Sequence, residues 1–147
     1  MATTHPGTTV EQRTSGKQIW LAGLLAALVS TVINVVLALV LRAALDISDE
    51  FSQLQPVAVV LNTVVATLLG TALYQLISRR ARRPLRTFAI VVGVVLVISM
   101  VPPLLLLGME SSPHYPGLSN AAALALLPLH LPPAAVLLYL LSRLRRP

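Results

Sequence analysis

The sequence predicts an all-α, polytopic membrane protein with four transmembrane helices and both termini in the cytoplasm. Its composition is the first observation: of 147 residues, 56% are hydrophobic and only 11% are charged, about half the charged fraction of a soluble domain. The second is a set of four long runs without Asp, Glu, Lys or Arg, at 19–41, 56–77, 88–107 and 118–141. The third is that all but one of the 11 Lys and Arg residues fall on one side of such a four-span chain.

Each of the four runs is long enough to be a membrane span, because a helix needs about 20 apolar residues to cross the bilayer core. The alternative is a soluble helical bundle, but soluble helices carry a polar stripe that these runs lack. Residues 1–17 are polar and rich in Thr, and we expect a disordered cytoplasmic tail there. The transmembrane domain is expected over 18–143, followed by a basic cytoplasmic end at 144–147.

Basic residues set the predicted orientation, because they stay on the cytoplasmic side of a membrane. They lie before the first span, between the second and third spans, and after the fourth: Arg13, Lys17, Arg79, Arg80, Arg82, Arg83, Arg86, Arg143, Arg145 and Arg146. Arg42 lies on the other side, beside the acidic residues Asp46, Asp49 and Glu50. We therefore expect a multi-pass protein of the cell inner (plasma) membrane. The arginine-rich connection is a candidate site for anionic lipids, and no motif indicates nucleic-acid binding.

Small residues recur at every fourth position in the first two spans, and such rows mark close helix contacts in lipid. In the first span the row is Ala22, Ala26, Ser30 and Asn34. In the second span it is Ala58, Asn62, Ala66 and Gly70. We expect the rows to pack together, so that Ala26→Leu or Ala66→Leu would destabilise the fold. The two asparagines lie about 12 and 9 Å deep, and they serve either as packing hydrogen bonds or as contacts for a substrate.

Prolines interrupt the third and fourth spans, and we expect both helices to be kinked there. The prolines are Pro102, Pro103, Pro128, Pro132 and Pro133. Each lacks a backbone N–H and leaves the carbonyl four residues earlier without its usual partner. The carbonyls concerned are those of Ile98, Ser99, Leu124, Pro128 and Leu129. Inside a membrane, other protein groups or water must satisfy them.

His130 lies about 16 Å into the fourth span, near the middle of the bilayer. Facing lipid there would be costly, so we expect it to face the bundle interior with a hydrogen-bond partner from another helix or from water. With Asn34, Asn62 and Ser99 it forms a predicted polar layer. Either these groups satisfy each other and set the helix register, or they line a cavity or a path for a solute or proton.

The sequence carries no recognisable catalytic chemistry, so we expect a protein that is not an enzyme. The chain has no cysteine, which excludes disulfides and thiol chemistry. It has no phosphate-binding glycine loop, no HExxH motif and no GxSxG motif. We expect no cofactor and no metal site.

Four short motifs point to a known family. They are STVINVV around Asn34, RPLRTF at 83–88, SMVPPL at 99–104 and HLPPAA at 130–135. On these motifs the chain resembles a family of uncharacterised bacterial four-helix integral membrane proteins, a domain of unknown function frequent in high-GC bacteria. The resemblance covers all four spans but not the tail, and it implies no activity and no site residue. Small multidrug exporters depend on a carboxylate in the first span and four-helix thiol oxidases on cysteines, so both fit less well.

Two classes of function remain. The first, which we favour, is a non-enzymatic structural, regulatory or partner-binding bundle, either as a homo-oligomer or with another membrane partner. The second is a small oligomeric transporter or channel lined by the polar layer. A path through the membrane needs polar lining in both halves, and the cytoplasmic half offers mainly Thr67, Thr71 and Gln75.

Overall fold

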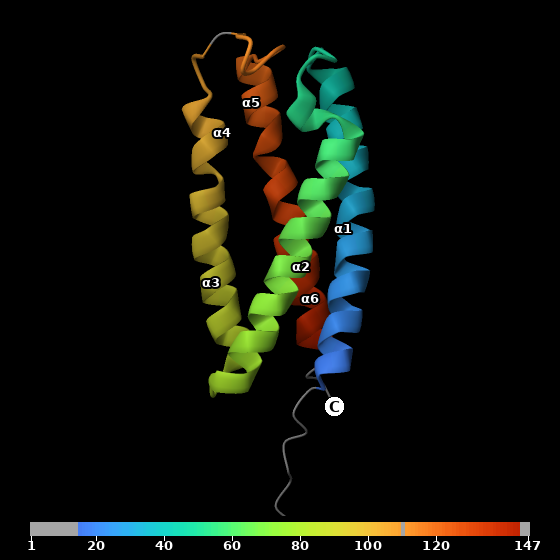
Figure 1. Cartoon of the computed structure of the whole chain (residues 1–147), viewed down its shortest axis with the longest axis vertical. Helices are drawn as coiled ribbons and strands as arrows, with labels where there is room; N and C mark the ends of the chain where they lie inside the picture. Colours follow the sequence, from blue (N-terminus) through green and yellow to red (C-terminus); the bar gives the residue numbers. More distant parts are fainter. Residues whose placement is uncertain (1–14, 110, 145–147) are drawn as a thin grey trace, which may run out of the picture.

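The computed structural model describes residues 15–109 and 111–144, which form an all-α structure (Figure 1). Its helices are, in order, α1 (Gly16–Ala44), η1 (Ser52–Leu54), α2 (Pro56–Arg80), α3 (Pro84–Ser99), α4 (Val101–Leu105), α5 (Asn120–Leu126), η2 (Pro128–His130) and α6 (Leu131–Arg143). Within this part of the chain, four segments are long and apolar enough to cross a membrane: α1, α2, α3 with α4, and α5 with η2 and α6. The predicted all-α class and its four apolar helices are therefore confirmed, and the chain is a multi-pass membrane protein.

The helices extend beyond the predicted apolar runs where end-capping groups are present. α1 begins at Gly16 because the Ser15 side chain accepts a hydrogen bond from the Gln18 backbone while the Gln18 side chain accepts one from the Ser15 backbone, a reciprocal cap that satisfies two free N–H groups. α2 continues to Arg80, and basic residues in a last turn favour the helix dipole. Apart from 15–17, the predicted tail (1–17) lies outside the described residues, as do 145–147 of the predicted basic end.

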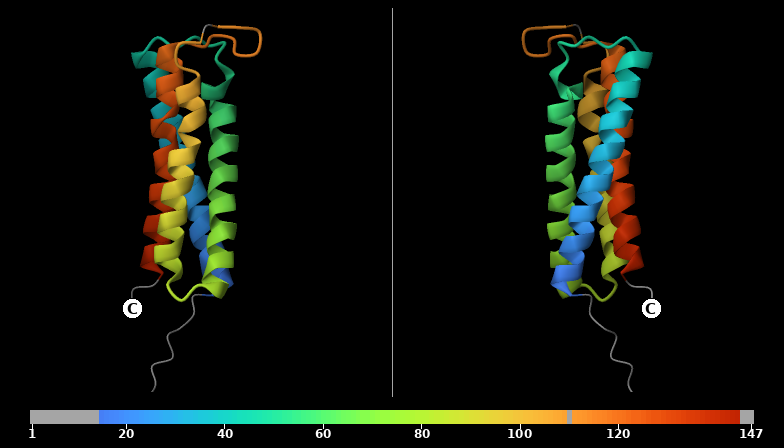
Figure 2. Two further views of the ribbon diagram at one scale, coloured as in Figure 1. Left: turned by 90° about the vertical axis from the view of Figure 1, so that its left-hand side faces the viewer. Right: turned by 90° about the vertical axis from the view of Figure 1, so that its right-hand side faces the viewer.

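The four spans lie side by side and alternate in direction (Figure 1 and Figure 2). The start of α1, the turn between α2 and α3, and the end of α6 lie together at one end of the bundle. We call this the arginine end, because that turn and its flanking helix ends carry five exposed arginines: Arg79, Arg80, Arg82, Arg83 and Arg86. The segments 45–55, 106–109 and 111–119 lie at the opposite end, which we call the loop end.

α1 packs most closely on α2 and presents small side chains to the bundle. Its buried residues include the whole predicted row of Ala22, Ala26, Ser30 and Asn34. The buried row on α2 is Val59, Thr63, Thr67, Thr71 and Tyr74. This differs from the predicted row of Ala58, Asn62, Ala66 and Gly70, whose members are half-buried or exposed. The prediction for α2 is wrong by one residue, which is about 100° around a helix.

The threonines explain this difference on α2. Thr67 donates a hydrogen bond to the carbonyl of Thr63 (2.7 Å), and Thr71 donates one to the carbonyl of Thr67 (2.8 Å). A threonine whose hydroxyl is satisfied four residues back within its own helix can be buried at little polar cost. The row therefore packs as small apolar side chains do, and Ala66, being exposed, loses the stabilising role predicted for it.

α1 and α2 approach each other closely at Gly23, a residue that the small-residue rows do not include. A Cβ atom at this position would overlap Oγ1 and Cγ2 of Thr71 and lie 2.8 Å from the Thr71 Cβ. A side chain at position 23 would therefore require Thr71 or one of the two helices to shift.

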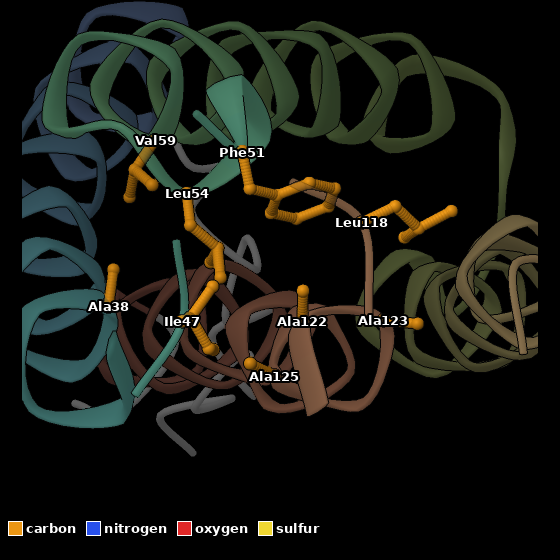
Figure 3. Packing of buried hydrophobic residues seen from close by; sticks show 9 residues of the cluster. All are labelled: Ala38, Ile47, Phe51, Leu54, Val59, Leu118, Ala122, Ala123 and Ala125. Carbon is orange, nitrogen blue, oxygen red and sulfur yellow. The ribbon is translucent and has the colours of Figure 1, made fainter. Parts of the chain in front are cut away.

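Two apolar clusters hold the bundle at its ends. The loop-end cluster comprises Ala38, Ile47, Phe51, Leu54, Val59, Leu118, Ala122, Ala123 and Ala125 (Figure 3). The arginine-end cluster comprises Ile19, Ala22, Ala26, Tyr74, Phe88, Leu137 and Leu141. In it the rings of Tyr74 and Phe88 meet edge to face, with centroids 5.1 Å apart and planes at 70°, a favourable arrangement for aromatic pairs.

The third span is attached to the bundle mainly near its two ends. Pro84 and Phe88 are the buried residues of α3, and Pro103 is the buried residue of α4. The regular helix is interrupted at Met100, just before Pro102 and Pro103, and in the fourth span at Pro128–His130. The middle of the third span is therefore not packed tightly against its neighbours.

Candidate functional site

A cavity of about 550 Å³ adjoins both apolar clusters, with walls from all four spans. Its volume falls in the range of pockets that bind small molecules, roughly 300–1,000 Å³. All four residues of the predicted polar layer line it: Asn34 from α1, Asn62 from α2, Ser99 from α3 and His130 from η2. The remaining lining is mostly apolar. The structure thus brings the four predicted polar residues, one from each span, to a single cavity, and α2 adds Thr63 and Thr67.

Asn34 joins three spans through its amide. The side chain is only 2% exposed, and its Nδ2 donates to Thr63 Oγ1 and to the carbonyl of Leu129, both at 2.9 Å. The Leu129 carbonyl is one that a proline, Pro133, deprives of its helical partner. The amide therefore satisfies a carbonyl freed in another span, and its partner on α2 is Thr63 rather than Asn62.

Ser30, one turn along α1, makes a second hydrogen bond from α1 to a backbone carbonyl of the fourth span. Its hydroxyl donates to the carbonyl of Pro132 at 3.4 Å. Ser30 is fully buried, so the predicted packing residue also anchors α1 to the proline-containing part of the fourth span.

His130 is half-buried, and its ring bonds within its own span. Nδ1 lies 2.8 Å from the carbonyl of Leu126, while the His130 backbone N–H donates to the Leu127 carbonyl in the 3₁₀ turn. This differs from the expected partner on another helix, because the turn before the prolines leaves a carbonyl of the same span within reach. A carbonyl oxygen only accepts, so Nδ1 carries the proton and a neutral ring has Nε2 as a hydrogen-bond acceptor.

Ser99 and Asn62 complete the polar layer on the third and second spans. The Ser99 hydroxyl donates to the carbonyl of Leu96, three residues back, at 2.8 Å. Asn62 is exposed at the cavity edge. The Ser99 hydroxyl is therefore bonded within its own helix, whereas the Asn62 amide lies at the edge of the cavity, where a bound molecule could contact it.

The cavity is closed toward the arginine end and reaches the surface sideways. Leu73, Phe88 and Leu137 line its arginine-end part, where Phe88 is fully buried. Leu69 of α2 and Val95 of α3 also line it and are 65% and 54% exposed. α2 and α3 diverge from the turn that joins them (Figure 1). The opening between them faces the lipid, because these are outward faces of membrane-spanning helices.

The predicted polar layer omits residues that complete this cavity. Thr63 was absent from the predicted polar layer, although threonines at 63, 67 and 71 form a visible row. The apolar floor at Phe88 and Leu137 had no signal of its own, because one Phe or Leu in an apolar run resembles any other.

The lining holds no Asp, Glu, Lys or Arg. Within residues 15–109 and 111–144, no three His, Asp or Glu side chains form a group that could hold a metal ion. The ion pair of this part of the chain, Arg42 with Asp49, is at the loop end, away from the cavity. The arrangement is suited to binding a neutral molecule by apolar contact and a few hydrogen bonds.

Comparison with known proteins agrees with the resemblance in the motifs. No curated protein and no solved structure matches the chain. The model of a family of unknown function, DUF6069, matches residues 14–147, which include all four spans. The chain therefore belongs to the DUF6069 family.

Proposed function

We propose that this protein is a non-enzymatic membrane protein that binds a small, mainly apolar molecule inside the bilayer. The observation that supports this most is that polar side chains from four spans line one mostly apolar cavity of about 550 Å³. The sideways opening at Leu69 and Val95 would admit such a molecule from the lipid. We also propose that the prolines bend the third and fourth spans around this space.

The second candidate, a small oligomeric transporter or channel, is less well supported. Thr71 and Gln75, two of the polar residues needed for the cytoplasmic half of a path, are not among the cavity lining. Thr71 faces Gly23 instead, and the buried pair of Tyr74 and Phe88 lies at the arginine end. A solute would meet an apolar floor there.

The surroundings of the protein are part of the proposal. We infer a bacterial protein whose partners are the lipids of the inner (plasma) membrane and a further copy or another membrane protein. The five exposed arginines of the arginine end support contact with anionic lipids, since a basic residue near such a surface contributes about 1 kcal/mol.

We expect both termini to be cytoplasmic. The chain has no cysteine, so single cysteines report sidedness without background. Glu50→Cys, an exposed position in the loop end, should react with a membrane-impermeant maleimide in intact cells. A cysteine appended after Pro147 should react only after lysis, because the basic residues hold that end inside. Labelling of the C-terminal cysteine in intact cells would contradict this topology.

Ligand binding can be tested with a photoreactive diazirine analogue of decanol in proteoliposomes, followed by peptide mapping. We expect saturable labelling of peptides from α2, α3 and η2 that excess decanol suppresses. Ala66→Phe, in the cavity lining, should fill the space and lower the saturable labelling at least about tenfold. Ala72→Phe, exposed on the same helix and outside the lining, should leave it unchanged. Labelling that rises linearly with photoprobe, as for any lipid-facing helix, would refute the proposal.

A further inference from the structure

A hydrogen-bond acceptor that the described residues leave unsatisfied lies in the wall of the cavity. Asn34 Oδ1 is buried and has no hydrogen-bond partner within the described residues, although its side chain lines the cavity. Both hydrogens of Nδ2 are engaged by Thr63 and by the Leu129 carbonyl. Turning the amide round would set Oδ1 against that carbonyl, and two acceptors do not bond. The orientation is therefore determined, and Oδ1 remains an acceptor without a donor.

Two further cavity residues present acceptors as well. The His130 ring gives its Nδ1 hydrogen to Leu126, so Nε2 of the neutral ring accepts. The Ser99 hydroxyl gives its hydrogen to Leu96, so its oxygen has lone pairs left. Asn34, His130 and Ser99 come from three different spans, and each offers an acceptor atom. The hydrogens on their polar groups are already bonded within the protein.

Charge restricts what can donate to them. A cationic amine would enter a low-dielectric space whose lining has no carboxylate to balance it. A carboxylate would find no Lys or Arg there, and only neutral amide donors such as those of Gln53 and Asn62. A neutral donor on an apolar body has neither penalty. An apolar alcohol is such a molecule, because its hydroxyl group is uncharged and donates a hydrogen bond.

We propose that the cavity selects apolar alcohols, whose hydroxyl donates to this acceptor set while the chain occupies the apolar part and the opening between α2 and α3. This inference rests on the proposed function, since it names the class of molecule bound there. The alcohol comes either from a hydroxyl-bearing lipid or from a smaller free alcohol, and both offer the same donor.

Competition against the decanol photoprobe tests the donor requirement in intact protein in proteoliposomes. Decanol and decyl methyl ether carry the same apolar chain and one oxygen atom, but only the oxygen of decanol carries a hydrogen that can be donated. We expect decanol to compete at least about tenfold better than the ether at equal membrane concentration, because a buried acceptor left unpaired is costly. Dioleoylglycerol serves as the lipid source: competition equal to that of decanol assigns the alcohol to a lipid, and weaker competition assigns it to a free alcohol.

Two variants test the acceptors. His130→Phe keeps a ring but removes Nε2, and Ser99→Ala removes one hydroxyl with little change in volume; each should reduce the preference for decanol over the ether. Thermal melting in detergent checks that each variant folds. If His130→Phe does not fold, the preference for decanol measured with Ser99→Ala tests the acceptor assignment. Saturable labelling without any preference in the wild type would overturn this inference and leave the proposed function standing. A preference unchanged in every folded variant would overturn the acceptor assignment, and absence of saturable labelling would overturn both proposals.

Discussion

Replacing Gly23 with alanine should lower the free energy of unfolding by about 2 kcal/mol, within the range for overpacking a tight contact. The new Cβ would overlap Oγ1 and Cγ2 of Thr71, and Thr71 is itself held by a 2.8 Å hydrogen bond to the carbonyl of Thr67. Relief therefore requires either breaking that bond or separating α1 from α2.

Thermal or denaturant unfolding in detergent measures this effect, with Gly93→Ala as the matched control. Gly93 lies in α3, is exposed, and has nothing within 4 Å of an added Cβ. Its replacement should be neutral or stabilising by up to about 1 kcal/mol, the gain in helix propensity. Adding Thr71→Ala to the Gly23 variant should recover part of the loss. Equal stability of the two single glycine variants would show that the helices do not cross at Gly23.

The substitution Asn34→Leu should destabilise the bundle by a similar amount, about 2 kcal/mol. It removes the hydrogen bonds to Thr63 and to the Leu129 carbonyl. Individual hydrogen bonds between membrane helices contribute only about 0.6 kcal/mol on average. Here the loss is larger because the carbonyl freed by Pro133 is left without a donor, and an unsatisfied buried group costs about 1–3 kcal/mol.

Asn62→Leu is the control for this second prediction. It makes the same chemical change at the other intramembrane asparagine, which is exposed and for which the described structure shows no hydrogen bond. We expect its unfolding midpoint to remain at or above that of the wild type. If both variants unfolded alike, Asn34 would have no special part in joining the spans.

The two asparagines show how far one sequence can be interpreted. Depth in the span predicted that Asn34 and Asn62 lie at similar heights, and both do line one cavity. Their roles differ because α2 is rotated so that Thr63, and not Asn62, faces α1. The row of Ala58, Asn62, Ala66 and Gly70 looked like a packing face because its residues are small. Three of these, Asn62, Ala66 and Gly70, line the cavity instead, where small side chains leave room.

His130 illustrates the same limit. Its position near mid-membrane predicted an inward orientation, and the residue does line the cavity. Its partner, the Leu126 carbonyl, could not be predicted, because that carbonyl is in reach only once the chain adopts a 3₁₀ turn at Pro128–His130.

The sequence by itself determined the all-α class, the four apolar segments and the polar positions within them, because length and hydrophobicity act on each segment separately. Only the tertiary structure decided which face of each helix is buried, that Gly23 receives Thr71, and that four polar residues share one cavity. The physical reason is that lipid is as apolar as the side chains it surrounds, so hydrophobicity does not distinguish one face of such a helix from another. The rotation of each helix is set by close packing and by a few interhelical hydrogen bonds, and both depend on the neighbouring helix.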